Sequence, residues 1–145
     1  MTRSSKTAWI FAVLLGSPVA HTLADNAHWS APAAAAQRRN PTPSNVASIE
    51  QGGRLFKQYC VSCHGPAGRG DGPAAASLKP HPADLAMMAG HHPDGDLAWK
   101  IANGRGAMPP WKGTLSDHQI WSLVNFIKSL PGTGSRQGNM EHHHQ

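Results

Sequence analysis

The feature that most restricts how this chain can fold is a short motif near its middle, Cys60-Val61-Ser62-Cys63-His64, which holds both of its 2 cysteines. Hydrophobic residues make up 39% of the 145 residues, and 15 Gly and 12 Pro interrupt them, so regular segments must be short. A small domain with few aliphatic side chains needs a covalent or metal-centred staple to be stable. The chemistry of this motif therefore decides the fold.

Two cysteines three positions apart can form a small disulfide, exchange thiols or supply half of a zinc site. A zinc site needs a second ligand pair, and no further Cys or well-spaced His pair follows. A thiol-exchange site needs a preceding strand, whereas the residues before Cys60 predict a helix and no strand-like run follows. Cys-x-x-Cys followed directly by His is instead the attachment signal for c-type haem. The thiols of Cys60 and Cys63 would bond to the porphyrin, and His64 would become an axial iron ligand.

The second axial position of the iron takes another side chain or stays open. The downstream candidates are methionines and histidines: Met87, Met88, Met108, Met140, His81, His91, His92 and His118. Met108 lies in Gly104-Arg105-Gly106-Ala107-Met108-Pro109-Pro110-Trp111, a segment that glycines allow to turn tightly and prolines then stiffen. Such a loop can hold a thioether against iron, so Met108 is the predicted ligand. Met87 and Met88 lack rigid flanks and are predicted to fill the core.

The last helix has the clearest start and stop signals. Ser116 and Gln119 predict a capping box, Leu115 lies at a staple position with Ile120, and Pro131 ends the helix. An apolar stripe at helical spacing gives this helix one core-facing side: Ile120, Leu123, Val124 and Ile127.

Two further helices are predicted before it. The first begins at Ser44 or Ser48 and runs to about Tyr59, and the middle one runs from Asp94 or Asp96 to Asn103, where Gly104 stops it. Glycine inside a helix costs about 1 kcal/mol relative to Ala, so Gly52 and Gly53 in the first helix call for a reason. We expect the last helix to approach closely at Gly52, with Phe126 stacking near Phe56.

Three separated stretches of the chain together resemble one family. Gly52 to Tyr59 lies before the motif as that family's N-terminal helix does, and the run from His64 to Pro73 resembles its haem-proximal loop. Met108-Pro109 is followed by a helix with Leu123 and Phe126 three apart, which completes the likeness. The segment from Val46 to Pro131 is thus similar to a class I cytochrome c. The resemblance implies a small all-α fold, with short helices wrapped around one haem.

The resemblance also implies a partner for the imidazole of His64. Its other ring N–H would donate to the carbonyl of Pro73 and fix the ring orientation. Trp111, just past Met108, is the indole best placed to reach a haem propionate, with plain packing in the loop as the alternative. Because the haem supplies so much of the core, we expect the chain without haem to be largely unfolded.

Both ends lie outside the predicted haem domain. Residues 1–24 predict a cleavable export signal: basic residues precede the apolar run Ala8–Leu15, and Thr22-Leu23-Ala24 offers a cleavage site, with an uncleaved anchor as the alternative. Residues 25–45, rich in Ala and Pro, predict a disordered linker. Residues 132–145 predict a flexible tail whose histidine run, His142 to His144, has no fixed geometry for a metal.

Charge and hydropathy restrict the partners. The formal net charge is +5, and the basic residues are spread thinly, which does not support nucleic-acid binding. No stretch of the mature chain reaches the roughly 18–20 apolar residues that span a bilayer. Four lysines, Lys57, Lys79, Lys100 and Lys112, could form a weak docking ring for an acidic partner, with a solvated surface as the alternative.

These observations predict a periplasmic, monomeric electron carrier rather than an enzyme, with one haem c held by His64 and Met108. The chain would serve either as a free shuttle or as the cytochrome subunit of a redox complex, and its partners would be redox proteins. The alternative is a haem-based sensor or peroxidase-like enzyme, in which Met108 leaves the iron so that a small molecule can bind.

Overall fold

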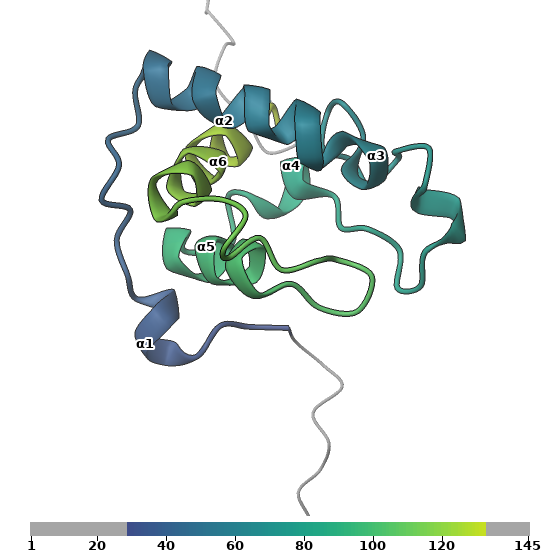
Figure 1. Cartoon of the computed structure of the whole chain (residues 1–145), viewed down its shortest axis with the longest axis horizontal. Coiled ribbons are helices and arrows are strands. Elements are labelled where there is room, and N and C mark those ends of the chain that lie inside the picture. Colours follow the sequence, from purple (N-terminus) through teal and green to yellow (C-terminus); the bar gives the residue numbers. More distant parts are fainter. Residues whose placement is uncertain (1–28, 133–145) are drawn as a thin grey trace, which may run out of the picture.

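The computed structural model describes residues 29–132, and within them every regular element is a helix. In chain order these are α1 (Ala33–Ala36), α2 (Val46–Tyr59), α3 (Val61–His64), a single 3-10 turn η1 (Ala75–Ser77), α4 (Leu85–Met88), α5 (Asp94–Asn103) and α6 (Asp117–Ser129). Figure 1 shows α2 lying across α6, with α5 beneath α6 and the long loops gathered beyond α3. The predicted all-α architecture is confirmed. The predicted export signal and the histidine run lie outside the described residues.

Helix α6 is the centre of the core and was predicted closely. Ser116 Oγ accepts from the Gln119 N–H and Gln119 Oε1 accepts from the Ser116 N–H, so the expected capping box is present. Ile120, Leu123 and Val124 are each at most 4% exposed, and Leu115 is buried beside them. The helix ends at Ser129, just before Pro131.

Helix α2 begins one residue after its cap, and that cap is not the residue expected. Asn45, rather than Ser44 or Ser48, is the N-cap: its side chain accepts from the Ser48 N–H at 2.9 Å, and Ser48 Oγ accepts from the Asn45 N–H at 3.1 Å. Serine at the third position therefore completes a capping box that the sequence reading missed. The predicted end at Tyr59 is confirmed.

The two long helices cross where α2 has no side chain. A Cβ added at Gly52 would run into the carbonyl oxygen of Ser122 and lie 2.7 Å from the Cβ of Phe126. The rings of Phe56 and Phe126 lie 5.1 Å apart with their planes tilted by 44°. Both the close approach at Gly52 and the aromatic contact are therefore as predicted.

Helix α5 has the predicted bounds. It runs from Asp94 to Asn103, and Gly104 ends it with a φ of 61°, a conformation that favours glycine. Two of its side chains, Leu97 and Ile101, are buried in the same core cluster as α6.

The stretch expected to be a disordered linker is packed against the helices over residues 29–45. Asn40 Nδ2 donates to Asn125 Oδ1 at 2.7 Å and to the Trp121 carbonyl at 3.1 Å, while Asn125 Nδ2 donates to the Thr42 carbonyl at 3.2 Å. Thr42 is only 7% exposed. The linker prediction is wrong for these residues, because hydrogen bonds to α6 hold the segment in place. Such polar contacts cannot be predicted from a pattern of apolar residues. We call residues 29–45 the N-terminal strap.

No helix among residues 29–132 is both long enough and apolar enough to cross a membrane.

Candidate haem attachment site

The two cysteines lie where α2 gives way to α3. Cys60 is the residue between the helices, and Cys63 is in the single turn of α3. Both are free, partly buried thiols, and Cys60 packs against the core cluster. Burial, with a smaller contribution from the neighbouring Cys63, raises the pKa of the Cys60 thiol to about 12. Cys60 is therefore a neutral thiol in an apolar setting rather than a thiolate poised for redox exchange.

His64, at the end of α3, is oriented by the loop that follows it. Its Nδ1 lies 3.1 Å from the carbonyl oxygen of Ala83, and with Nδ1–H as the donor the lone pair of Nε2 is available to a metal. The prediction that Pro73 supplies this carbonyl is wrong, because Pro73 is exposed on the outgoing side of the loop. The later part of the loop, around Ala83, passes the imidazole instead. It is held there by the Leu85 N–H, which donates to the Gly68 carbonyl at 2.6 Å.

The charge state of His64 suits a ligand. Burial lowers the pKa of the His64 imidazole, although its hydrogen bond to the Ala83 carbonyl acts in the opposite direction. A lowered pKa keeps the ring neutral at neutral pH, and neutral imidazole is the form that binds iron.

Met108 is carried by a loop that is fastened at both ends. Met108 and Arg105 exchange two backbone hydrogen bonds, at 2.9 and 3.0 Å, which close a tight turn. Beyond it, the Trp111 N–H donates to the carbonyl of Ile101 at 3.1 Å, so the loop returns to the last turn of α5. Gly104 permits this path, because a Cβ there would run into the Met108 carbonyl. The expected rigid loop is present, and the role of Met108 as a ligand stays a prediction.

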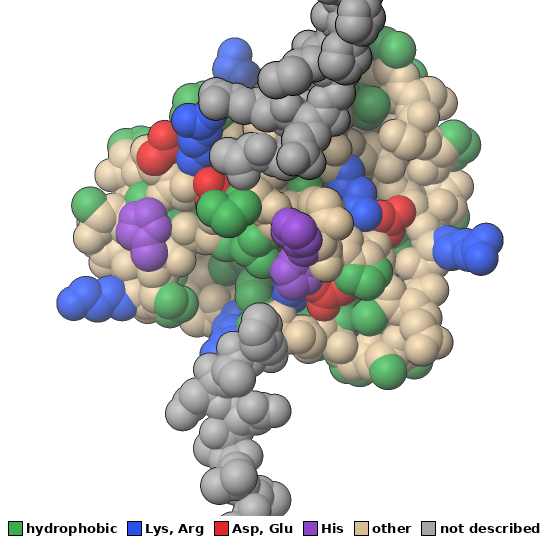
Figure 2. Space-filling view, turned by 180° about the vertical axis from the view of Figure 1, so that it is seen from behind, with side chains coloured by type: hydrophobic (Ala, Val, Ile, Leu, Met, Phe, Trp, Pro, Cys, Tyr) green, Lys and Arg blue, Asp and Glu red, His purple; other side chains and the backbone are tan. Residues whose placement is uncertain are grey.

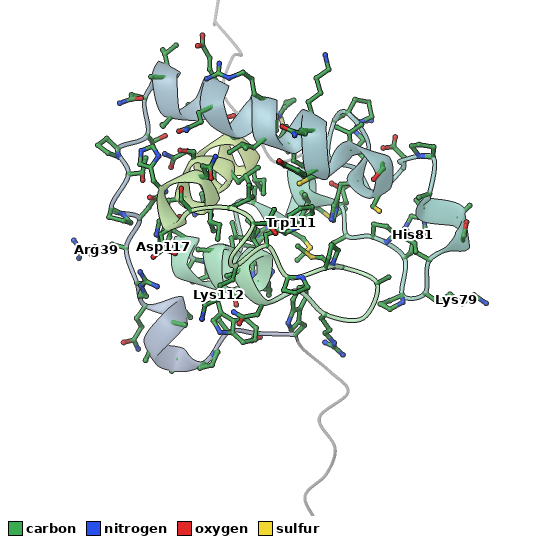
Figure 3. The ribbon with its side chains drawn as sticks, in the orientation of Figure 1. Arg39, Lys79, His81, Trp111, Lys112 and Asp117 are labelled. Atoms are coloured by element: carbon green, nitrogen blue, oxygen red, sulfur yellow. The ribbon has the colours of Figure 1, made fainter. Side chains whose placement is uncertain are left out.

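Trp111 connects this loop to the cysteine side of the site. Its ring lies 5.0 Å from the ring of Tyr59, the last residue of α2 and the neighbour of Cys60. Figure 3 shows Trp111 near the middle of the molecule, between the helices and the loops. The same core cluster is contacted by Cys60, Met108 and Trp111. The fold thus brings the Met108 loop to the motif, and the contact of Trp111 with a propionate stays a prediction.

The other candidate ligands within the described residues lie in different settings. Met87 is 54% exposed, so its prediction as a core residue is wrong, while Met88 is half-buried. His81, His91 and His118 are exposed. His92 is engaged elsewhere, with its Nδ1 2.7 Å from Asp96 Oδ2.

The predicted lysine ring loses one member. Lys100 is buried, and its Nζ lies 2.7 Å from Asp96 Oδ2. The remaining lysines Lys57, Lys79 and Lys112 are exposed, and Figure 3 shows Lys79 at the outer edge of the loops, away from Lys112. Figure 2 shows the basic side chains of the opposite face scattered over it rather than gathered in one patch. The burial of Asp96 could not be predicted from the sequence, because an acidic residue in the first turn of a helix usually lies in solvent.

The donor set fits a haem and does not fit a metal cluster. Two thiols three residues apart, a neutral imidazole beside them and a thioether that packs against the same core cluster as Cys60 are the groups that a c-type haem binds. Among residues 29–132 no three His, Cys, Asp or Glu side chains gather as they would around a metal ion.

Comparison with known proteins gives the family. Residues 47–127, more than half of the chain, match the family described as cytochrome c oxidase, cbb3-type, subunit III. The chain belongs to this family of c-type cytochromes. The predicted resemblance is therefore confirmed, and the family implies covalently bound haem c and supports an electron-carrier role.

Individual relatives agree with the family. The chain is 32% identical over 91 residues to the cbb3-type cytochrome c oxidase subunit FixPc of Rhizobium leguminosarum bv. viciae, covering 63% of this chain and 31% of that protein. It is 35% identical over 82 residues to cytochrome c6 of Leptolyngbya boryana, covering 56% of this chain and 91% of that protein. A solved Kuenenia stuttgartiensis reducing HAO-like protein complex, Kustc0457/Kustc0458, matches with a TM-score of 0.56 and 28% identity, covering 62% of this chain and 46% of that one. The chain spans about a third of the length of the FixP subunits it matches.

Proposed function

We propose that this cytochrome carries single electrons with one haem c, bound through Cys60 and Cys63 and ligated axially by His64 and Met108. The observation that supports the proposal is that each proposed ligand stands on a segment held in place by hydrogen bonds. The Ala83 carbonyl fixes the imidazole of His64, and α5 fixes the loop of Met108. A site closed on both sides by protein side chains suits electron transfer, which needs no substrate at the metal.

The surrounding residues would set the properties of this site. Bound haem iron supplies the one-electron change between its ferrous and ferric states. A thioether opposite an imidazole raises the reduction potential, and an apolar core disfavours the more highly charged ferric form. Leu55, Tyr59 and Trp111 belong to the core cluster or pack against it, as do Cys60 and Met108, so they would give the haem an apolar surround. We therefore expect the haem to have a positive reduction potential.

The setting in the cell is also a proposal. The export signal predicted over residues 1–24 would deliver the chain to the periplasm. There it would act as a monomer that exchanges electrons with redox proteins. Relatives named as cytochrome c6 and as oxidase subunits agree with a free shuttle and with a subunit of a complex, respectively.

Two pairs of variants test the proposal. Cys60→Ala combined with Cys63→Ala should abolish haem staining on a denaturing gel, whereas Ser62→Ala, between them, should keep it. Met108→Ala should let ferrous protein bind carbon monoxide, whereas the half-buried Met88→Ala should not. Haem staining at the normal level in the double cysteine variant would refute covalent attachment at this motif. Carbon monoxide binding by Met88→Ala and not by Met108→Ala would refute the ligand assignment.

A further inference from the structure

The N-terminal strap, which precedes the residues that match the family, lies directly on the first turn of α5. The Ala31 N–H donates to Asp96 Oδ1 at 2.7 Å. Gly95, beside it, is buried under the strap: an added Cβ would run into the Ala35 carbonyl oxygen and lie 2.7 Å from the carbonyl oxygens of Ala36 and Arg38. Figure 1 shows the strap passing beneath α5 and then climbing to α2. The backbone of the strap and the backbone of α5 are therefore in direct contact.

Asp96 makes this attachment a charged one. The residue is 3% exposed, and its Oδ2 lies 2.7 Å from both Lys100 Nζ and His92 Nδ1. Trp29, at the start of the described strap, lies over the Lys100 ammonium, which is 5.7 Å from the ring centroid. A hydrogen bond to a buried, ionised carboxylate is stronger than one between neutral groups. The hydrogen bond from Ala31 to Asp96 is therefore a strong attachment between the strap and α5.

The far end of the strap is fixed to α6. The Arg38 guanidinium lies 5.4 Å from the centroid of the Trp121 ring, and Asn40 donates to Asn125 and to the Trp121 carbonyl. The strap therefore bridges α5 and α6 and holds their relative positions.

The opposite end of α5 carries the loop of the proposed ligand. The carbonyl of Ile101 accepts from the Trp111 N–H, and that of Ala102 accepts from the Lys112 N–H at 3.0 Å. A helix of ten residues is about 15 Å long, and its backbone hydrogen bonds connect its two ends. A displacement of its first turn, at Gly95 or Asp96, would therefore displace the Met108 loop as well.

We infer that the N-terminal strap positions the Met108 loop, by fixing the first turn of α5 through Gly95 and Asp96. The inference rests on the proposed ligation by Met108. Gly95 and Asp96 are positioning residues: neither belongs to the donor set, and both act through α5.

The decisive variant is Gly95→Ala in the full haem-loaded chain. Alanine favours a helix over glycine, so if the contact between the strap and Gly95 is unimportant, Gly95→Ala should be unchanged in stability or more stable. If the strap must lie against Gly95, the new methyl group should push the strap away and make Gly95→Ala less stable. Gly90→Ala, in the turn after α4, controls for the addition of a methyl group, since a Cβ there meets nothing within 4 Å.

The measurement is the competition of imidazole with Met108 for ferric iron, followed by loss of the sulfur-to-iron charge-transfer band, with the chemical unfolding midpoint recorded in parallel. We expect Gly95→Ala to increase the apparent affinity for imidazole about tenfold, and Gly90→Ala to leave it unchanged. Asp96→Asn should act in the same direction as Gly95→Ala. A lower unfolding midpoint in Gly95→Ala with the normal imidazole affinity would overturn the inference, because the strap would then serve stability alone. Equal behaviour of Gly95→Ala and Gly90→Ala would also overturn it. Absence of the sulfur band from the unaltered protein would instead overturn the proposed ligation.

Discussion

The crossing of α2 and α6 at Gly52 makes a quantitative prediction about two adjacent glycines. In Gly52→Ala the new Cβ would meet the carbonyl oxygen of Ser122 and lie 2.7 Å from its carbonyl carbon. These are backbone atoms of a buried helix and cannot turn aside. In Gly53→Ala the nearest atoms are Cδ2 and Cε2 of the Phe126 ring, both at 3.2 Å, and a ring edge can move by a few tenths of an ångström.

Both substitutions gain the same helix propensity, about 1 kcal/mol, so their difference isolates the cost of the contact. Overpacking a tight interface costs about 1–3 kcal/mol. We therefore expect Gly52→Ala to be about 1–3 kcal/mol less stable than Gly53→Ala, and Gly53→Ala to be close to the unaltered protein.

The assay is guanidinium unfolding of the haem-loaded protein, followed by far-ultraviolet circular dichroism and analysed for the free energy of unfolding. Gly53→Ala serves as the control for helix propensity. Equal stability of the two variants, or a more stable Gly52→Ala, would refute the claim that α2 and α6 approach to backbone contact here.

Three further predictions concern the haem, its ligand and the buried carboxylate. Removal of the haem should leave the chain largely unfolded, since the helices lose their common core; helical circular dichroism that survives in the apo-chain would contradict this. Met108→Ala should lower the reduction potential, whereas the exposed Met87→Ala should leave it unchanged in a redox titration. Burial acts to raise the pKa of Asp96, but hydrogen bonds from Lys100, the strap N–H of Ala31 and His92 outweigh it and lower the pKa. The stability that Asp96 contributes is therefore present above the ordinary carboxyl pKa of about 4 and is lost as the pH falls through its lowered folded value. Unfolding free energies measured across that acid range should fall less steeply in Asp96→Asn than in the unaltered protein, and parallel curves would contradict the role given to this carboxylate.

The sequence predicted best where a local pattern decides the structure. Three features follow from residue types at fixed spacing: the cap of α6 at Ser116, the end of α5 at Gly104 and the close helix approach at Gly52. Such features need only near neighbours in the chain. They were enough to identify the all-α fold and the haem motif.

The errors arose where distant parts of the chain decide the structure. The carbonyl that faces His64 belongs to Ala83 and not Pro73, and the choice depends on how a long, irregular loop returns. The strap looked disordered because Ala and Pro carry no periodicity, and its order comes from Asp96 and Asn125, both far along the chain. Lys100 looked like a surface charge because nothing in the neighbouring sequence shows that Asp96, its partner, is buried.

The central claim is that His64 and Met108 together close the iron on both sides. The most direct test is the absorption spectrum of the haem-loaded protein, first oxidised, then reduced and exposed to carbon monoxide. The account predicts a sulfur-to-iron charge-transfer band in the ferric form and no spectral shift when carbon monoxide is added to the ferrous form. A missing sulfur band together with ready carbon monoxide binding would contradict it and would favour the sensor or peroxidase-like alternative.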